Sequence, residues 1–486
     1  MKKKVFLTGL VSVLAISSLV ACGKKSSQGA ADNKDLSNII KIAYKDENAS
    51  NPNSKKYFDE LSKLMKEKDG VDVVFEVVDL PGEGYQEKLN LQISSGDIPD
   101  IIYFQGGDTM SAEQGLLEDL NPYIKKSSYI KNIIEPHNEK RLENYPYLMW
   151  IKPATASVPV IKKKILEETQ IGKEFQENPT VDNYTKLFKE VIGKKDEKGQ
   201  EVKYAITTSG NTNELDSIFD MAFGNTQTWQ KTDKGYIYKR VSENEKEKIA
   251  YYKSLYDEKL LDNQFITKKW DTKENAFYDG ETALIAGTSG KVIDMYSTKA
   301  KELSGSELVV LPPAKGKSQG YGAVNLSKED RGLAIYSQSA NKDLAFKVLD
   351  FLASPEGQQL DRLGFENEHY KIEGEKITVL DESGEWYAKF WEPKELKVTK
   401  ELSSPLLGEE ANKSIDLVSE YYSEDNSFII PDDMVAKWDA AENVYKETIA
   451  DMITGKKSID EFDKFVKQWQ ESGGQEITDY ANEKLK

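Results

Sequence analysis

Strands and helices alternate near the start of the chain, and this alternation constrains the possible folds more than any other feature. Apolar runs rich in β-branched residues predict strands at 39–44, 71–78 and 98–104. Amphipathic segments at 55–68 and from Tyr85 to Ile93 predict the helices between them. The dense run at 71–78 is typical of a strand that is buried on both faces of a parallel sheet. The β-α-β-α-β order therefore implies a doubly wound α/β lobe.

The rest of the chain continues this mixed pattern. Further strands are predicted at 282–286 and 332–336, and a regular apolar stripe predicts a long helix at 431–454. Extended segments at 154–161 and 320–326 are suited to crossing from one lobe to another. The sequence therefore predicts an α/β protein that ends in helices.

The N-terminus has the pattern of an export signal. Three lysines follow Met1, and the apolar run at 5–20 is too short and too interrupted to span a bilayer, which takes roughly 20 apolar residues. The sequence LVACG at 19–23 then resembles the lipobox of bacterial lipoproteins, whose cysteine is acylated and becomes the first residue after cleavage. We therefore predict a protein anchored on the extracellular face of the cell membrane, with a signal peptide at 1–21, palmitate or a related acyl chain on Cys22, and a flexible tether at 22–35.

Composition narrows the classes of ligand. The net charge of −17 repels the phosphate backbone of nucleic acid and anionic lipid headgroups alike. The chain has only two histidines, so histidine-based metal or acid/base chemistry has few residues to draw on. Because Cys22 is the only cysteine, no disulfide can form within the chain.

Four stretches resemble the large carbohydrate-type extracellular solute-binding proteins of ABC importers, in the order in which that family has them. They are YQEKLNL with SGDIPDI at 85–101, FYDGETAL at 277–284, NKDLAFKVLDFL with SPEGQ at 341–358, and LGFENEHY at 363–370. The last stretch is similar to one typical of the longer, oligosaccharide-binding branch. Leu284 stands where the family usually has methionine.

The resemblance implies an α/β fold with two lobes of the periplasmic-binding-protein type (type II, Venus flytrap), joined by hinge strands and followed by C-terminal helices. It assigns residues 36–156 and 322–400 to lobe 1, and residues 157–321 and 401–486 to lobe 2. It also implies a monomer that binds an oligosaccharide between its lobes, without turnover and without a cofactor. The ligand would then pass to the ABC permease subunits in the membrane.

Sugars present flat C–H faces and rings of hydroxyls, so their sites combine aromatic platforms with fixed polar groups. In open α/β lobes, ligands lie beyond the carboxyl ends of the strands, which selects Asp46, Gln105 and Asp108 as polar candidates. Relatives often have an aromatic residue in the loop at 287–290. This chain has GTSG there, so Ser289 indicates a hydroxyl contact or a roomier site. The aromatic candidates are Tyr44, Trp229, Trp270, Trp386 and Trp391.

Two alternative functions and one possible metal site stand beside this interpretation. Some relatives contain a calcium loop, but the stretch at 194–201 does not meet the D-x-[DN]-x-[DN]-G pattern and predicts a surface hairpin without metal. A lipid-anchored glycoside hydrolase or polysaccharide lyase stays open, because 83 acidic residues leave room for a catalytic carboxylate pair. A peptide-binding lipoprotein of similar length is the other alternative.

Overall fold

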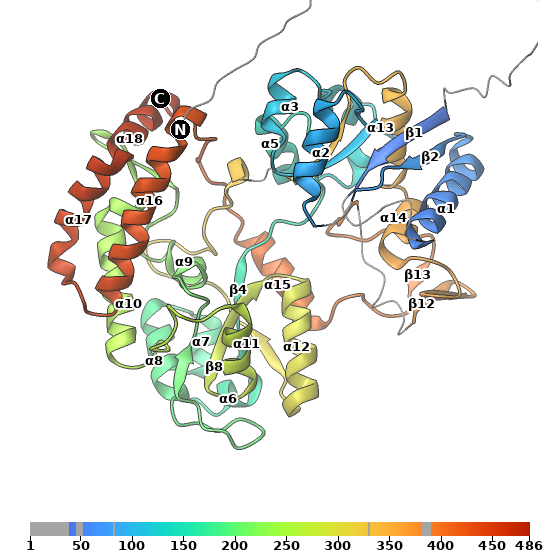
Figure 1. Cartoon of the computed structure of the whole chain (residues 1–486). Coiled ribbons are helices and arrows are strands. Elements are labelled where there is room, and N and C mark those ends of the chain that lie inside the picture. The colour runs from blue at the N-terminus through green and yellow to red at the C-terminus, as the bar shows by residue number, and fades with distance from the viewer. Residues whose placement is uncertain (1–37, 45–51, 81–82, 329–330, 381–389) are drawn as a thin grey trace, which may run out of the picture. The chain divides into compact units, whose positions relative to one another are not determined.

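The computed structural model describes residues 38–44, 52–80, 83–328, 331–380 and 390–486 (Figure 1). The predicted signal peptide, the acylated Cys22 and the tether lie outside these ranges. Across the described ranges, no helix combines the length and the apolar character needed to cross a membrane.

The first sheet has the strand order β10-β3-β1-β2 and confirms the predicted β-α-β-α-β order. Its strands β1, β2 and β3 are parallel, whereas β10 pairs antiparallel with β3. The strands are β1 Ile39–Ala43, β2 Val74–Val77, β3 Ile101–Gln105 and β10 Arg331–Ile335; the helices are α1 Pro52–Asp69, α2 Tyr85–Ser94, α3 Thr109–Glu113, α4 Asn121–Ile124, α5 Pro136–Asn144, α13 Lys342–Phe351 and α14 Pro355–Leu363.

The prediction that residues 71–78 form a strand buried on both faces is wrong. The strand β2 spans only four residues, and Val74 is 51 % exposed. The reason is its position, because β2 lies at the edge of the sheet and has β1 as its only neighbour there. A β-branched run marks a strand but does not fix its place in the sheet.

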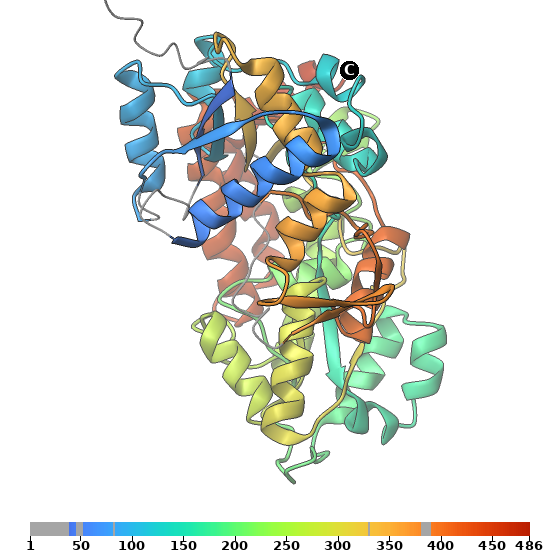
Figure 2. The same cartoon turned by 90° about the vertical axis from the view of Figure 1, so that its right-hand side faces the viewer.

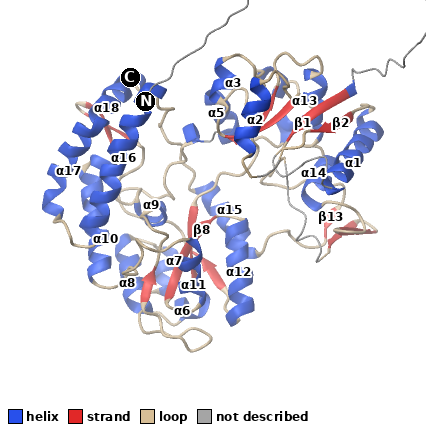
Figure 3. Ribbon diagram, viewed as in Figure 1, coloured by secondary structure: helices blue, strands red, loops and turns tan. Residues whose placement is uncertain are grey.

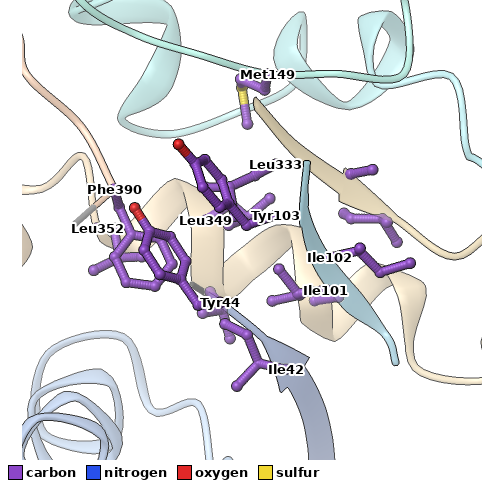
Figure 4. Packing of buried hydrophobic residues seen from close by; sticks show 14 of the residues in the cluster. Ile42, Tyr44, Ile101, Ile102, Tyr103, Met149, Leu333, Leu349, Leu352 and Phe390 are labelled. Atoms are coloured by element: carbon purple, nitrogen blue, oxygen red, sulfur yellow. The ribbon is translucent and has the colours of Figure 1, made fainter. Parts of the chain in front are cut away.

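Segments far apart in the sequence build the core of this first region. Figure 2 shows α14, in orange, next to α1, in blue, and the Tyr57 hydroxyl on α1 donates a 2.9 Å hydrogen bond to the Asp361 carboxylate on α14. Close by, Ile42, Ile102 and Leu333 from three different strands pack together (Figure 4). Residues after 330 are therefore needed to complete the sheet that begins at residue 39.

The second sheet has the order β5-β8-β4-β9 and its own hydrophobic cores. The strand β8 is parallel to β5 and antiparallel to β4, so the sheet is mixed. The predicted strand at 282–286 is confirmed as part of β8. The strands are β4 Ser157–Lys162, β5 Tyr204–Ile206, β8 Thr282–Thr288 and β9 Leu308–Val310; the helices around them are α6 Lys163–Glu167, α7 Gly172–Glu177, α8 Val181–Val191, α9 Asn213–Phe219, α11 Trp270–Tyr278 and α12 Lys291–Ser304.

The chain ends in helices that pack on this second region (Figure 3). The predicted helix at 431–454 is confirmed as α16, and its apolar stripe contributes Ala441, Tyr445 and Ile449 to the core. The helix α15 packs against α12 and β9. The elements are α10 Glu243–Asp257, α15 Glu409–Glu420, α16 Asp432–Ile453, α17 Phe462–Trp469, α18 Gln475–Lys484 and the hairpin β6 Trp229–Thr232 with β7 Gly235–Tyr238.

Three stretches of chain connect the two sheets. Residues 152–156 lead from the first sheet into β4, and residues 311–328 lie between β9 and β10. After α14 the chain forms a small sheet of β11 Tyr370–Glu373, β12 Lys376–Val379 and β13 Glu401–Leu402 before it enters α15. The lobe boundaries at 156/157, 321/322 and 400/401 stay predictions.

Candidate ligand-binding site

The carboxyl ends of two strands meet at one edge of the second sheet. Ser157, the first residue of β4, pairs with Thr288, the last residue of β8. The strand β5 runs parallel to β8 and ends at Ile206, opposite Leu284. Because ligands of α/β proteins bind beyond the carboxyl ends of strands, this edge of the sheet is suited to a ligand-binding site.

A polar hollow of about 340 Å³ lies at this edge, and we call it the α9 hollow. It is lined by one side of α9, by the start of β4 and by the connection before β10. The polar side chains that line it are Thr155, Ser157, Asn213, Asp216, Ser217, Asp220, Lys239, Arg240 and Asn325. Amide, carboxylate, hydroxyl and cationic groups are thus gathered in one small volume.

A buried ion network holds the carboxylates of the α9 hollow in place. The Lys248 side chain is 1 % exposed, and its Nζ lies 2.8 Å from Asp216 Oδ1 and 3.0 Å from Glu245 Oε2. It also pairs with Asp220, which lies 2.8 Å from Lys239 Nζ as well. Burial opposes ionisation of Asp220, but Lys239 and Lys248 outweigh it and hold the pKa of this carboxyl below its usual range. The hollow therefore holds the ionised Asp220 carboxylate and its neighbour Asp216 in fixed positions.

Further contacts fix the remaining polar groups. Asp216 accepts hydrogen bonds from Thr212 Oγ1 and from the Tyr252 hydroxyl, both at 3.1 Å. The Arg240 guanidinium lies 2.6 Å from Glu442 Oε2 and 4.4 Å from the centre of the Tyr445 ring. These groups need little rearrangement to meet a ligand, which lowers the entropic cost of binding.

Trp270 presents an exposed ring close to the same edge. It is the first residue of α11 and is 43 % exposed, while every other tryptophan in the described ranges is more buried. The ammonium of Lys273 lies 3.8 Å from the ring centre and donates a 2.9 Å hydrogen bond to the carbonyl of Ala286 on β8. The lysine thereby ties the ring to the end of the strand that borders the candidate site.

A second hollow of about 450 Å³ flanks the same edge, and we call it the α12 hollow. It shares Thr155 with the α9 hollow and includes the loop after β8. Gly287, the residue before the last one of β8, leaves no room for a larger side chain. A Cβ atom at Gly287 would lie 2.5 Å from the ring of Tyr296. Ser289 lines the α12 hollow and is 6 % exposed.

The polar candidates of the first sheet lie after β3. Gln105 is half-buried, and its backbone amide donates to Gln86 Oε1 at 3.4 Å. Asp108 is 2 % exposed and accepts a 2.9 Å hydrogen bond from the Tyr147 hydroxyl, so it faces the protein interior. Burial and this carboxylate raise the pKa of Tyr147. Asp46 and Trp386 lie outside the described residues.

Three of the predicted aromatic platforms lie in hydrophobic cores. The Tyr44 ring is 6 % exposed and stacks 4.6 Å from the Tyr103 ring (Figure 4). Trp229 is 1 % exposed and stacks 5.6 Å from Phe428, and Trp391 is 1 % exposed with its indole N–H bonded to a backbone carbonyl. A ring that is buried in a core cannot stack on a sugar. Among the predicted aromatic candidates that the structure describes, Trp270 is the one with an exposed ring.

The sequence pattern did not single out the residues of the α9 hollow. Asn213, Asp216 and Arg240 lie in stretches that look like ordinary polar surface, and Lys248 looks like one more lysine on a charged helix. The one usable signal is spacing, since Asp216 and Asp220 lie one helical turn apart.

The predicted hairpin at 194–201 is confirmed by the bridge between Lys195 and Glu201. Its Asp196 is fully buried rather than on the surface. One carboxylate oxygen accepts from the backbone amides of Lys198 and Gln200, and the other lies 3.0 Å from Lys162 Nζ. The Lys162 ammonium therefore neutralises the buried carboxylate of this loop.

Comparisons with known proteins agree with this architecture. An HMO-binding, ABC-transporter-associated solute-binding protein from Bifidobacterium longum infantis superposes with a TM-score of 0.63 at 17 % identity, over 92 % of this chain and 98 % of that one. The N-glycan transport solute-binding protein of Streptococcus pneumoniae gives 0.63 at 16 % identity, over the same shares. The likeness shows the fold, which is the two-lobed α/β fold of solute-binding proteins.

Sequence comparisons point the same way. Lipoprotein LipO of Bacillus subtilis (strain 168) is 20 % identical over 447 residues, which cover 82 % of this chain and 83 % of LipO. The sequence profile of the family described as bacterial extracellular solute-binding protein matches residues 48–359. The proteins of this family bind their solutes and are not enzymes. The chain thus belongs to the bacterial extracellular solute-binding proteins.

Proposed function

We propose that this protein is the lipid-anchored receptor of an ABC importer and that it captures an oligosaccharide. The α9 hollow is the observation that supports this best, because it gathers fixed donors and acceptors at the carboxyl edge of a sheet. Two proteins of the same fold are named for binding HMO and for transporting an N-glycan. A ligand of the same class suits the polar lining of the hollow.

The chemistry of the hollow matches a ring of hydroxyls. Each sugar hydroxyl donates one hydrogen bond and accepts others, so its site needs carboxylates beside amides and cations. Asp216 and Asp220 supply acceptors, Lys239 and Arg240 supply donors, and Asn213 supplies both. Charge-assisted hydrogen bonds of this type are stronger than neutral ones.

Trp270 is the proposed platform for a sugar ring. Its exposed ring offers a flat apolar surface at the border of the second sheet. The ammonium of the buried Lys273 contacts this ring and keeps it in position. We propose that the ligand extends from the hydrogen-bonding groups of the hollow toward this ring. Gln105 and the loop that contains Asp46 are proposed to contribute from the first lobe.

A lipid on Cys22 is the proposed anchor, and the permease of an ABC importer is the proposed partner. Acylation of Cys22 would hold the folded part close to the membrane, where the permease subunits lie. The protein is proposed to act as a monomer and to release its oligosaccharide to the permease without cleaving it.

A glycan array followed by calorimetry on the best glycans tests the proposal. Trp270→Ala should weaken binding of the best glycan by about 1–3 kcal/mol, because the sugar loses an aromatic stacking surface. Met295→Ala is a matched control, since Met295 is also 43 % exposed and lines neither hollow. Absence of any bound glycan would contradict the proposal, and so would cleavage of the glycan during incubation.

A further inference from the structure

The amino end of α12 is open toward the α12 hollow. Helix α12 has 14 residues and begins after Gly290, whose φ of 81° and ψ of −120° suit glycine. The Ser414 side chain accepts the backbone amide of Gly290 at 2.8 Å, and the helix has no cap from its own N-cap residue. Its first-turn carboxylate, Asp294, instead accepts the backbone amide of Gly408 at 2.7 Å. The N–H groups of residues 291–293 and the positive dipole end of the helix are therefore left for another acceptor.

Ser289 provides a second, independent sign of a missing partner. Its backbone amide donates to the carbonyl of Ala156 at 3.0 Å, which fixes the residue directly before the helix. Its side-chain Oγ is buried and has no hydrogen-bond partner in the described part of the chain. A buried hydroxyl without a partner is costly, so a lining residue of this kind indicates a ligand group that meets it.

The cationic side chains around the α12 hollow indicate the charge of the ligand group that would meet Ser289. Arg362 lies 3.2 Å from Glu392, and Lys394 lies 3.6 Å from Asp416, so both are balanced. Lys291 lines the hollow as the first residue of α12, and it pairs with no carboxylate among the residues that the structure describes. A lysine that is unpaired among the described residues and lies beside the positive end of a helix dipole is unusual in a chain of net charge −17. The α12 hollow therefore suits an anionic ligand group and not a cationic one.

The rest of the lining indicates what bears the anion. The remaining lining of the hollow forms an aliphatic wall, which consists of Pro153, Val292, Pro393, Leu396, Leu402, Leu406, Leu407 and Ile415. A small inorganic ion would leave this wall uncovered. A sugar ring with a charged substituent instead presents both a C–H face for the wall and an anionic group for the helix end.

We propose that the α12 hollow binds the carboxylate of an acidic sugar residue, of the uronic acid class, within the captured oligosaccharide. Ser289 Oγ and the first amides of α12 donate to the carboxylate, and Lys291 neutralises it. This inference rests on the proposed function and specifies its substrate class.

Calorimetry on the full chain tests this with acidic tetrasaccharides built of uronic acid residues, and with the same tetrasaccharides after methyl esterification. Ser289→Ala and Lys291→Gln should each weaken binding of the acidic form about tenfold, the scale of one charged hydrogen bond, and leave the esterified form unchanged. Lys301→Gln removes the same charge at the other end of α12 and should have no effect. Circular dichroism checks that the variants are folded.

The outcomes separate this inference from the proposed function. If the protein binds esterified or neutral glycans as tightly as acidic ones and the two substitutions change nothing, the acidic-sugar site is refuted and the receptor function stands. A preference for sulfated over carboxylated glycans would also overturn the inference as stated. If no glycan binds at all, the receptor function and the inference fail together.

Discussion

At the scale of single residues, Lys248 is the side chain on which the candidate site depends most. Its ammonium meets Asp216, Asp220 and Glu245 in the interior of the second region, where an unpaired charge is costly. The same contacts explain why a polar hollow with several carboxylates can exist above a hydrophobic core.

Lys248→Met should therefore lower the free energy of unfolding by about 3–5 kcal/mol, since three carboxylates lose their shared cation. Urea denaturation followed by circular dichroism measures this loss. Lys253→Met on the same helix is the control, because its pair with Asp257 is partly exposed to solvent and worth at most about 1 kcal/mol. Equal effects of the two substitutions would show that Lys248 has no special role.

The tryptophans show that the exposure of a single side chain cannot be predicted from the local sequence. Trp229 and Trp270 both follow polar loops, and nothing local distinguishes them. Trp229 is covered by Phe428 and Trp438, about 200 residues later in the chain. Such partners are decided by the tertiary fold, so the sequence predicted aromatic residues at the site but not which ones.

At the scale of elements, the periodicity of apolar residues predicts most strands and helices. It does not predict which elements pack against one another. The long helix α16 follows its apolar stripe, and β8 follows its apolar run. The position of β2 at a sheet edge depends on strand order, which the run of valines does not encode. The hairpin at 194–201 was likewise predicted as a surface feature, although Lys162 on β4 buries its Asp196.

This hairpin should make stability depend on acid pH. Burial opposes ionisation of Asp196, but Lys162 and the amide of Gln200 outweigh it and lower the pKa of this carboxyl. Its contribution is therefore complete above the unfolded pKa of about 3.9 and is lost as the pH falls toward the lower folded pKa.

The free energy of unfolding, measured in urea from pH 5 to pH 2, should fall less steeply in Asp196→Asn than in the unsubstituted protein. Asp233→Asn, in the exposed turn between β6 and β7, should keep the original slope. Identical slopes in all three proteins would argue against a contribution from Asp196.

At the scale of the whole molecule, we propose that the predicted export signal and Cys22 decide where the protein works. Cys22 and the polar stretch after it precede the first described strand, so acylation of Cys22 would attach the chain to the membrane ahead of its folded part. The expected attachment is the lipid alone, since the surface charge is strongly negative.

Cys22→Ser should move the protein from the membrane fraction to the soluble fraction of the producing cells and abolish labelling by radioactive palmitate. Its ligand affinity, measured on the purified variant, should not change. Ser26→Ala, four residues further along the tether, should leave the protein in the membrane fraction. Membrane retention of Cys22→Ser would exclude acylation as the anchor.

The packing around Trp229 also sets an order of events during synthesis. Its enclosure needs Phe428 and Trp438, and Asn482, near the end of the chain, bonds through its side chain to both the amide and the carbonyl of Tyr236. A ribosome that has made only the first 400 residues has therefore supplied the first sheet in full but not the cover of this tryptophan. Premature termination after residue 400 would expose a large aromatic surface, so incomplete chains become natural substrates for chaperones and quality-control proteases.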